Sequence, residues 1–137
     1  MKLKLAHICI LTNDLQKTLY FYEKVLGMTK VFDFVKAGDL YGYYIKMSDN
    51  NFIEVFKEET IGEKAGGTFQ HLCLETDDIK ESFKKIRSMG IETTEIKKGC
   101  DNTFQIWFKD PNGLDIELHQ YTELSSQLTG KECEVDW

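Results

Sequence analysis

The sequence contains no apolar run near the roughly 20 residues that a membrane-spanning helix needs, and no basic segment followed by an apolar stretch opens it. These absences argue against a membrane protein and against a secretory signal peptide. Cationic residues are also in deficit, with 17 Lys and Arg against 23 Asp and Glu, a net charge of -6 and a pI near 5.1. Such a chain is a poor ligand for nucleic acid or anionic membranes. We therefore expect a cytoplasmic protein that binds neither.

Cysteines are few and none form a CxxC pair: Cys9, Cys73, Cys100 and Cys133. Without a secretion signal, reduced thiols are a better interpretation than disulfides. Hydrophobic residues make up 42% of the chain and charged residues 29%, which is typical of a globular protein. A length of 137 residues fits one compact domain, or two small halves that share a core.

The first half of the chain predicts a strand, a helix and three more strands. LKLAHICIL alternates like a strand, and Asn13 or Asp14 can cap the helix that follows. That helix has an apolar stripe and ends at Gly27. Three further strands are expected at 29–36, 41–47 and 52–57, the last two joined by the turn-forming run from Ser48 to Asn51.

The second half repeats this order. GTFQHLCLE predicts a strand, Asp77 and Asp78 begin a helix, and Gly90 ends it. Strands are expected at 91–97, 103–109 and 113–119, with the last hairpin turn at Asp110-Pro111-Asn112-Gly113. His71 follows His7 by 64 positions, as Asp78 follows Asp14. The separation falls to 63 for Gly27 and Gly90 and for Glu54 and Glu117, so one residue is lost late in the second helix.

The repeat predicts an α+β fold built from two tandem βαβββ modules, which form a curved mixed sheet with helices on its outer face. Alone, a module of about 55 residues would bury too little apolar surface to be robust. We therefore expect one domain over 1–137: module one at about 3–57, a linker at 58–66, module two at about 67–121 and a C-terminal extension at 122–137.

Aliphatic and polar residues alternate in the first and last strand of each module. The aliphatic residues must pack on the helices: Ile8, Ile10, Ile53 and Val55, then Leu72, Leu74, Ile116 and Leu118. The polar residues between them should then point into a common concavity: His7, Glu54, His71 and Glu117. Two imidazoles and two carboxylates that face a partly enclosed cleft are costly without a partner. We predict that these four residues bind one divalent cation.

Two imidazoles and two carboxylates without thiolate suit Ni²⁺, Co²⁺, Zn²⁺, Mn²⁺ or Fe²⁺, and disfavour a structural zinc site built on cysteines. Cys9 and Cys73 lie two residues beyond the histidines and share their face, where small wall residues are a better interpretation than ligands. His119 faces the same cleft. It could contact substrate or shuttle a proton, and a solvated position at the rim is equally consistent with the sequence.

Four segments carry a resemblance to a known family: HICILTNDLQKTLYFYEKVLGM, NNFIEVF, GTFQHLCLETDDI and WFKDPNGLDIELHQY. From Leu3 to Tyr121 the chain resembles the vicinal oxygen chelate superfamily, and most closely the short bacterial form of glyoxalase I (lactoylglutathione lyase). The family's four metal ligands fall on His7, Glu54, His71 and Glu117. The resemblance implies one divalent ion per site, with Ni²⁺ or Co²⁺ favoured and Zn²⁺ as the alternative, and a homodimer.

The resemblance further implies a lyase or isomerase of methylglyoxal detoxification, which converts the hemithioacetal of a 2-oxoaldehyde and a thiol into a 2-hydroxyacyl thioester. Glu117 is the expected base, with Glu54 as the symmetric alternative. Glutathione-using members carry an arginine where this chain has Leu11, so the identity of the thiol stays open.

Three other activities are compatible with the same superfamily. An Fe(II) dioxygenase needs two histidines and one carboxylate, and Glu54 would fill a position that oxygen requires. The related epimerases have Gln where this chain has Glu54. A resistance or binding protein that sequesters a small molecule would need no complete ligand set, so four retained ligands weigh against it.

Overall fold

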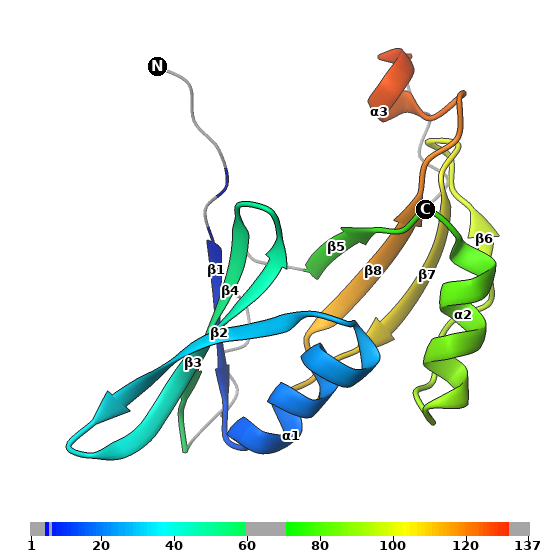
Figure 1. The fold of residues 1–137 in the computed structure, drawn as a ribbon. Coiled ribbons are helices and arrows are strands. Elements are labelled where there is room, and N and C mark those ends of the chain that lie inside the picture. The colour runs from blue at the N-terminus through cyan, green and yellow to red at the C-terminus, as the bar shows by residue number, and fades with distance from the viewer. Residues whose placement is uncertain (1–4, 6, 60–70, 132–137) are drawn as a thin grey trace, which may run out of the picture. The chain divides into compact units, whose positions relative to one another are not determined.

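The structure, a computed structural model, describes Leu5, residues 7–59 and residues 71–131, and divides into two compact units, Met1–Gly67 and Thr68–Trp137. The predicted linker lies mostly outside the described residues. Figure 1 labels the strands and the α-helices of both units. No helix in the described part of the chain combines the length and the apolar character that crossing a membrane requires.

The first unit is a βαβββ module. Its elements are β1 (His7–Thr12), α1 (Leu15–Tyr20), η1 (Phe21–Val25), β2 (Thr29–Lys36), β3 (Asp39–Ser48) and β4 (Asn51–Lys57). The strands form a sheet in the order β1-β4-β3-β2, in which β1 is parallel to β4 and the other neighbours are antiparallel. The first strand of the chain therefore lies beside the last strand of its module.

The second unit has the same topology. Its elements are β5 (His71–Glu75), α2 (Ile79–Ser88), β6 (Lys97–Lys98), β7 (Phe104–Lys109), β8 (Asp115–Gln120) and α3 (Ser126–Thr129). The sheet order is β5-β8-β7-β6, with β5 parallel to β8. The expected α+β fold of two repeated modules is confirmed, and each module forms its own four-stranded mixed sheet.

The helix of each unit packs on its own sheet through the aliphatic residues that the alternation predicted. Ile53 and Val55 of β4 and Ile116 of β8 have no exposed surface. Tyr22 from the first helical segment also has no exposed surface, and Ile79 and Ile86 from α2 are buried. Each such side chain contributes about 1.5–3 kcal/mol through burial. The opposite face of each sheet is left for the polar residues.

The two helices begin with the same hydrogen-bonded arrangement. Asp14 accepts a hydrogen bond from the Lys17 amide at 2.9 Å, and Asp78 accepts from the amides of Lys80 and Glu81. Such caps satisfy amides that have no partner within the helix. Two residues before each cap, a threonine hydroxyl also pairs with a helix hydroxyl at 2.8 Å: Thr12 with Thr18, and Thr76 with Ser82. The repeat therefore extends to individual side-chain contacts.

The π-helical turn η1 explains why the repeat separation changes from 64 to 63. The first helical segment continues from α1 into η1, whereas α2 is α-helical throughout. A π-turn closes over five residues instead of four and accommodates one extra residue without changing the helix axis. Both segments then end at a glycine with positive φ, 71° at Gly27 and 79° at Gly90, as the sequence predicted.

Two expected elements differ from the observed ones. Of the strand predicted at 91–97, only Lys97 forms regular pairing, because Thr94 contacts Trp107 through its side-chain hydroxyl as well as its amide. The segment after Gln120 does not simply extend from the module. Buried Ser125 donates to the carbonyl of Asn102 at 3.2 Å, and Gln127 donates to Asp101 at 2.6 Å. Hydrogen bonds therefore connect α3 and the residue before it to the loop between β6 and β7.

Candidate metal centre

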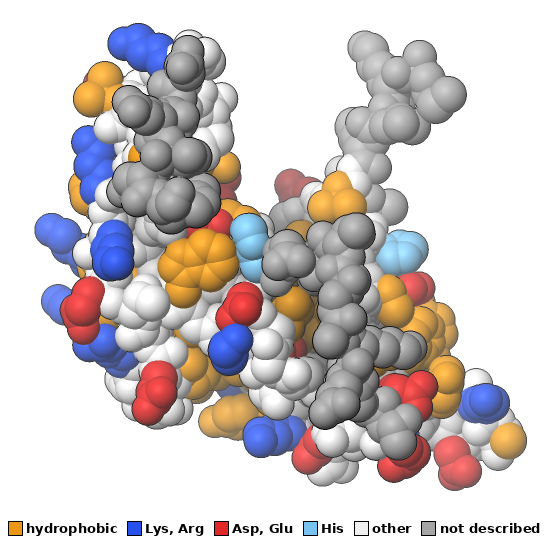
Figure 2. Space-filling view, turned by 180° about the vertical axis from the view of Figure 1, so that it is seen from behind, with side chains coloured by type: hydrophobic (Ala, Val, Ile, Leu, Met, Phe, Trp, Pro, Cys, Tyr) orange, Lys and Arg blue, Asp and Glu red, His pale blue; other side chains and the backbone are white. Residues whose placement is uncertain are grey.

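In the first unit, parallel pairing of β1 and β4 brings His7 and Glu54 together. The Nε2 atom of His7 lies 3.3 Å from Oε2 of Glu54, and both side chains are on the polar face of the sheet. His7 is exposed to solvent, and the Glu54 side chain is 22% exposed. Histidine side chains are visible at the surface in the space-filling view (Figure 2). The pair is open to a ligand from solution.

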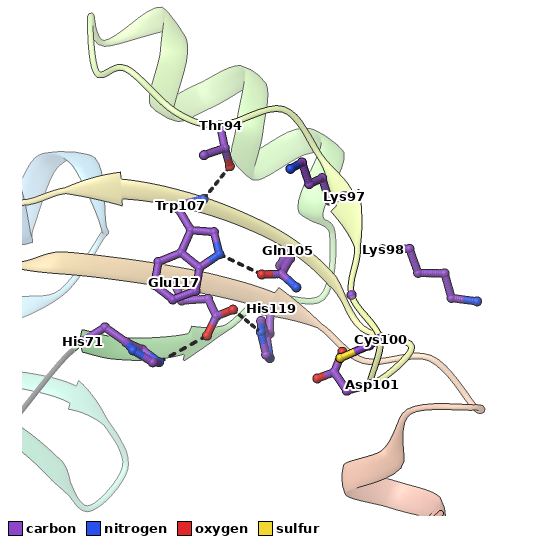
Figure 3. Close-up of a pocket in the computed structure, with 11 residues that line it drawn as sticks. His71, Thr94, Lys97, Lys98, Cys100, Asp101, Gln105, Trp107, Glu117 and His119 are labelled. Carbon is purple, nitrogen blue, oxygen red and sulfur yellow. Dashed lines mark hydrogen bonds and ion pairs between the residues drawn. The ribbon is translucent and has the colours of Figure 1, made fainter. Parts of the chain in front are cut away.

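In the second unit, β5 and β8 place His71 and Glu117 in the same way. Nε2 of His71 lies 3.4 Å from Oε2 of Glu117, and Figure 3 shows the two side chains pointing toward each other. The Glu117 side chain is only 10% exposed, so it is less hydrated than Glu54. The structure thus brings the four predicted ligands together as two His–Glu pairs, one in each unit. Convergence of both pairs on one cation remains a prediction.

An aromatic residue on β3 contacts His7, and one on β7 contacts His71. The hydroxyl of Tyr44 lies 3.2 Å from Nδ1 of His7, which leaves Nε2 directed at Glu54. In the second unit the ring of Trp107 meets His71 edge-on, with centroids 4.9 Å apart, and its indole donates to Gln105 at 2.7 Å. Tyr44 stands opposite Glu54 in the β3–β4 pairing, as Trp107 stands opposite Glu117 in the β7–β8 pairing. The sequence signal for Tyr44 is its spacing of 63 residues from Trp107, the same spacing that separates Glu54 from Glu117.

His119 is not a solvated residue at the rim of the cleft. It is 8% exposed, and its Nε2 atom lies 2.8 Å from Oε1 of Glu117 (Figure 3). The contact is close, but its direction is poor for a hydrogen bond, so this buried nitrogen has no well-directed partner among the described residues. Glu117 therefore lies between two imidazoles, with one oxygen directed at each.

The two cysteines on this face are thiols in the ion-free protein. Cys73 lies at the sheet edge, where neighbouring side chains partly desolvate its sulfur; this desolvation and the charge of Glu117 raise the pKa of Cys73 to about 12. Partial desolvation and the charge of Glu54 also raise the pKa of Cys9. Neither forms a disulfide, as the sequence led us to expect.

A cavity of about 600 Å³ opens on the polar face of the second unit. His71, Glu117 and His119 lie at one side, and Trp107 contributes an apolar wall. The loop around β6 supplies the opposite side with Lys97, Lys98 and Asp101. A cavity of this size can hold a small organic molecule next to Glu117.

The residues present fit a divalent cation by their chemistry. Each unit offers an imidazole nitrogen and a carboxylate oxygen close enough to be bridged, because ligand atoms around one ion lie about 3 Å or more apart. The contact of Tyr44 with Nδ1 of His7 also fits, since metal-binding histidines commonly use their second nitrogen in this way. The partly buried Glu117 would gain a compensating charge.

Comparison with known proteins agrees with the fold. The sequence profile of the Glyoxalase/Bleomycin resistance protein/Dioxygenase superfamily matches residues 4–118, and the chain belongs to this superfamily. A protein described as a probable lactoylglutathione lyase from Vibrio parahaemolyticus is 30% identical over 139 residues, covering 93% of this chain and 97% of the relative. A probable lactoylglutathione lyase from Synechocystis is 34% identical over 128 residues, covering 85% and 94%.

Solved structures share the fold at lower identity. The fosfomycin resistance protein FosX from Listeria monocytogenes, solved with Mn(II), superposes with a TM-score of 0.73 at 20% identity, covering 90% of this chain and 95% of FosX. The same fold therefore occurs in a protein described as a fosfomycin resistance protein, so the fold alone does not decide the activity.

Proposed function

We propose that this protein is a glyoxalase I-like isomerase that uses a divalent metal ion to convert a hemithioacetal into a 2-hydroxyacyl thioester. The observation that supports this most is the repeated His–Glu pair, at 3.3 Å in one unit and 3.4 Å in the other, on equivalent strands. Relatives described as lactoylglutathione lyases that align over most of the chain support the same activity.

The proposed ligands are His7, Glu54, His71 and Glu117, with Ni²⁺ or Co²⁺ as the favoured ions. Such a cation would supply positive charge to stabilise the negative charge that develops on the two neighbouring oxygens of the substrate. Tyr44 fixes the ring of His7 by its contact with Nδ1. Trp107 limits the ring positions open to His71 and excludes water from one wall of the cavity.

Glu117 is the proposed base. It takes the proton from the carbon next to the substrate carbonyl and returns it to the neighbouring carbon, so that no net oxidation occurs. The side chain suits this task because it is 10% exposed and adjoins a cavity that can hold the substrate. Glu54, which retains more water contact, is better suited to a role as ligand alone.

The proposal is tested with purified protein stripped of metal and then reloaded with Ni²⁺, Co²⁺ or Zn²⁺. Thioester formation from methylglyoxal and a thiol should require the ion and should be lost in Glu117→Gln. A cation at 100 times its dissociation constant should also stabilise the fold by about 2.7 kcal/mol. Oxygen consumption instead of thioester formation would indicate a dioxygenase, and tight binding of a small molecule without turnover would indicate a sequestering protein.

Glutathione is one of several thiols to be compared in this assay. Leu11, exposed in β1, offers no charge to the carboxylates of glutathione at the position where related enzymes use arginine. We therefore propose a thiol whose recognition does not depend on this position. Rates that are equal for glutathione and for an uncharged thiol such as 2-mercaptoethanol would support this, whereas strict dependence on glutathione would contradict it.

We also propose that the protein is a homodimer, by analogy with the superfamily. Light scattering of the metal-loaded protein at several concentrations measures this directly. A monomeric mass throughout the range would contradict the proposal without affecting the isomerase assay.

A further inference from the structure

Three potential metal ligands of different chemistry converge in the second unit. The Sγ atom of Cys73, a carboxylate oxygen of Glu117 and a ring nitrogen of His119 all lie within 4.8 Å of one another. Cys73 stands directly opposite Glu117 in the parallel β5–β8 pairing, and His119 follows Glu117 by two residues on the same face. Two adjacent strands of one sheet therefore fix the positions of all three groups.

The state of His119 points independently to a missing ligand. Its Nε2 atom is buried and makes no well-directed hydrogen bond among the described residues, although a buried imidazole nitrogen normally has a partner. This atom lies beside the carboxylate, 2.8 Å from Oε1 of Glu117 (Figure 3). A cation placed there would satisfy the nitrogen and would lie against the carboxylate.

The donor set selects for a particular kind of cation. Zinc accepts thiolate, imidazole and carboxylate, with bonds of about 2.0–2.3 Å, so that ligand atoms in a tetrahedral site are about 3.3–3.8 Å apart. The three donor atoms lie within 4.8 Å of one another and would approach to this range on binding an ion. Three protein ligands leave a fourth position for water or for a ligand in the adjoining cavity.

We propose that Cys73, Glu117 and His119 form a thiolate-containing metal site, suited to Zn²⁺, whose donor set differs from that of the two His–Glu pairs. On binding, the Cys73 sulfur loses its proton to solvent and becomes a thiolate ligand. The site needs residues of the second unit only and does not depend on the proposed isomerase activity. Because it shares Glu117 with the four-residue set, zinc held there would compete with a catalytic ion.

The first unit provides a natural control for this proposal. Cys9 stands opposite Glu54 in the β1–β4 pairing, just as Cys73 stands opposite Glu117. The residue two positions after Glu54 is Phe56, which has no metal-binding atom. The first unit therefore has the thiol and the carboxylate but lacks the imidazole, so Cys9 should not bind the ion.

The test uses Co²⁺ as a spectroscopic substitute for Zn²⁺, because a cobalt–thiolate bond gives a charge-transfer absorption in the near ultraviolet. The full-length chain carries His7→Ala and Glu54→Gln, which remove the first unit's share of the four-residue set. In this background the absorption should appear on titration with Co²⁺, persist in Cys9→Ser and disappear in Cys73→Ser. His119→Phe, which installs the residue of the first unit, should weaken Co²⁺ binding by more than about 10-fold.

No charge-transfer absorption, or an absorption that survives Cys73→Ser, would overturn the proposal. Circular dichroism establishes that each variant is folded. If Cys73→Ser does not fold, the wild-type protein is alkylated with and without Zn²⁺, and the modification of each cysteine is measured. Zn²⁺ should protect Cys73 but not Cys9. Equal modification of both cysteines in the presence of Zn²⁺ would reject the site. The isomerase assay measures thioester formation and does not detect a metal–sulfur bond. The proposed zinc site and the proposed isomerase activity can therefore fail independently.

Discussion

His119 in β8 occupies the position that Phe56 occupies in β4, two residues after the carboxylate of its unit. This is one of the differences between the polar faces of the two units. In the first unit the ring of Phe56 packs against Phe34, with centroids 4.7 Å apart. In the second unit His119 instead places a nitrogen 2.8 Å from Glu117. The two carboxylates of the repeat are therefore not equivalent.

The first prediction concerns this inequality. Glu117→Gln should lower kcat for thioester formation by about 10²–10⁴-fold, the usual contribution of a general base. Glu54→Gln should act mainly by weakening the metal, so that excess ion restores much of its rate. Steady-state kinetics at low and saturating metal separate the two effects. Equal and irrecoverable losses in both variants would contradict the assignment of Glu117 as the base.

The second prediction concerns the contact between Tyr44 and His7. Tyr44→Phe removes the hydroxyl group 3.2 Å from Nδ1, so the ring of His7 is no longer fixed in its metal-binding orientation. Metal affinity, measured by titration calorimetry, should fall by about 10-fold, at the lower end for such supporting contacts because the pair is exposed. Tyr41→Phe, on the same strand, is the matched control and should leave the affinity unchanged.

The third prediction concerns the cap of α2. Asp78→Ala removes the acceptor for the amides of Lys80 and Glu81 and should cost about 1 kcal/mol of unfolding free energy in urea. Asp77→Ala, one residue earlier and exposed, removes a similar charge without removing the cap. A comparable loss in both variants would assign the effect to charge and not to capping.

The fourth prediction concerns the close approach of β3 and β4. A Cβ atom added at Gly42 would collide with the carbonyl oxygen of Val55 and lie 2.7 Å from the Phe56 ring. Because backbone cannot yield as a flexible side chain does, Gly42→Ala should destabilise the fold by about 1–3 kcal/mol. Lys46→Ala, exposed on the same strand, should change stability by less than about 0.5 kcal/mol. Thermal and urea unfolding measure both.

The fifth prediction concerns Asp101, which accepts a hydrogen bond from Gln127 in the segment after β8. Burial alone would raise its pKa, but hydrogen bonds from Gln127 and Thr103 outweigh burial and lower the pKa below the usual 3.8. A carboxyl group whose pKa is lower in the folded protein than in the unfolded chain stabilises the fold. This stabilisation is complete at pH values above the unfolded-state pKa and is lost as the pH falls through the folded-state pKa. Gln127→Ala should therefore destabilise the protein at neutral pH, and by less at about pH 3.

Urea unfolding of wild type and Gln127→Ala at both pH values measures this difference. Leu128→Ala, at an exposed neighbouring position, is the control and should show no pH-dependent gap. A gap between wild type and Gln127→Ala that grows on acidification would contradict the sign of the Asp101 effect.

Local patterns were sufficient to predict most of the fold. The strand at Thr29–Lys36 has the predicted bounds, and Asp14 and Asp78 cap the helices as expected, because alternation and capping depend on near neighbours. The short β6 was overestimated because Thr94 replaces regular backbone pairing with a side-chain contact. Such competition between side chain and backbone is not visible in a hydropathy pattern.

The sequence was sufficient to name the two His–Glu pairs of the candidate site, but not to predict their surroundings. The repeat identified His7 and His71 because identical residues recur at a fixed spacing. It gave no indication that His119 is buried, since burial depends on the cross-strand neighbours of β8 and on the segment that follows it. The role of Tyr44 was hidden for a similar reason, because its partner His7 is 37 residues away in sequence.

The π-turn at Phe21–Val25 holds one residue more than a regular helix would need to reach Gly27. We expect a deletion within these five positions to convert the turn to α-helix and to keep Gly27 at the end of the helix. The same deletion inside α2 would rotate the residues beyond it by about 100° and misdirect its apolar stripe. The two helical segments thus differ in their expected tolerance of a deletion. The first contains the extra residue of a π-turn, and α2 contains no such residue.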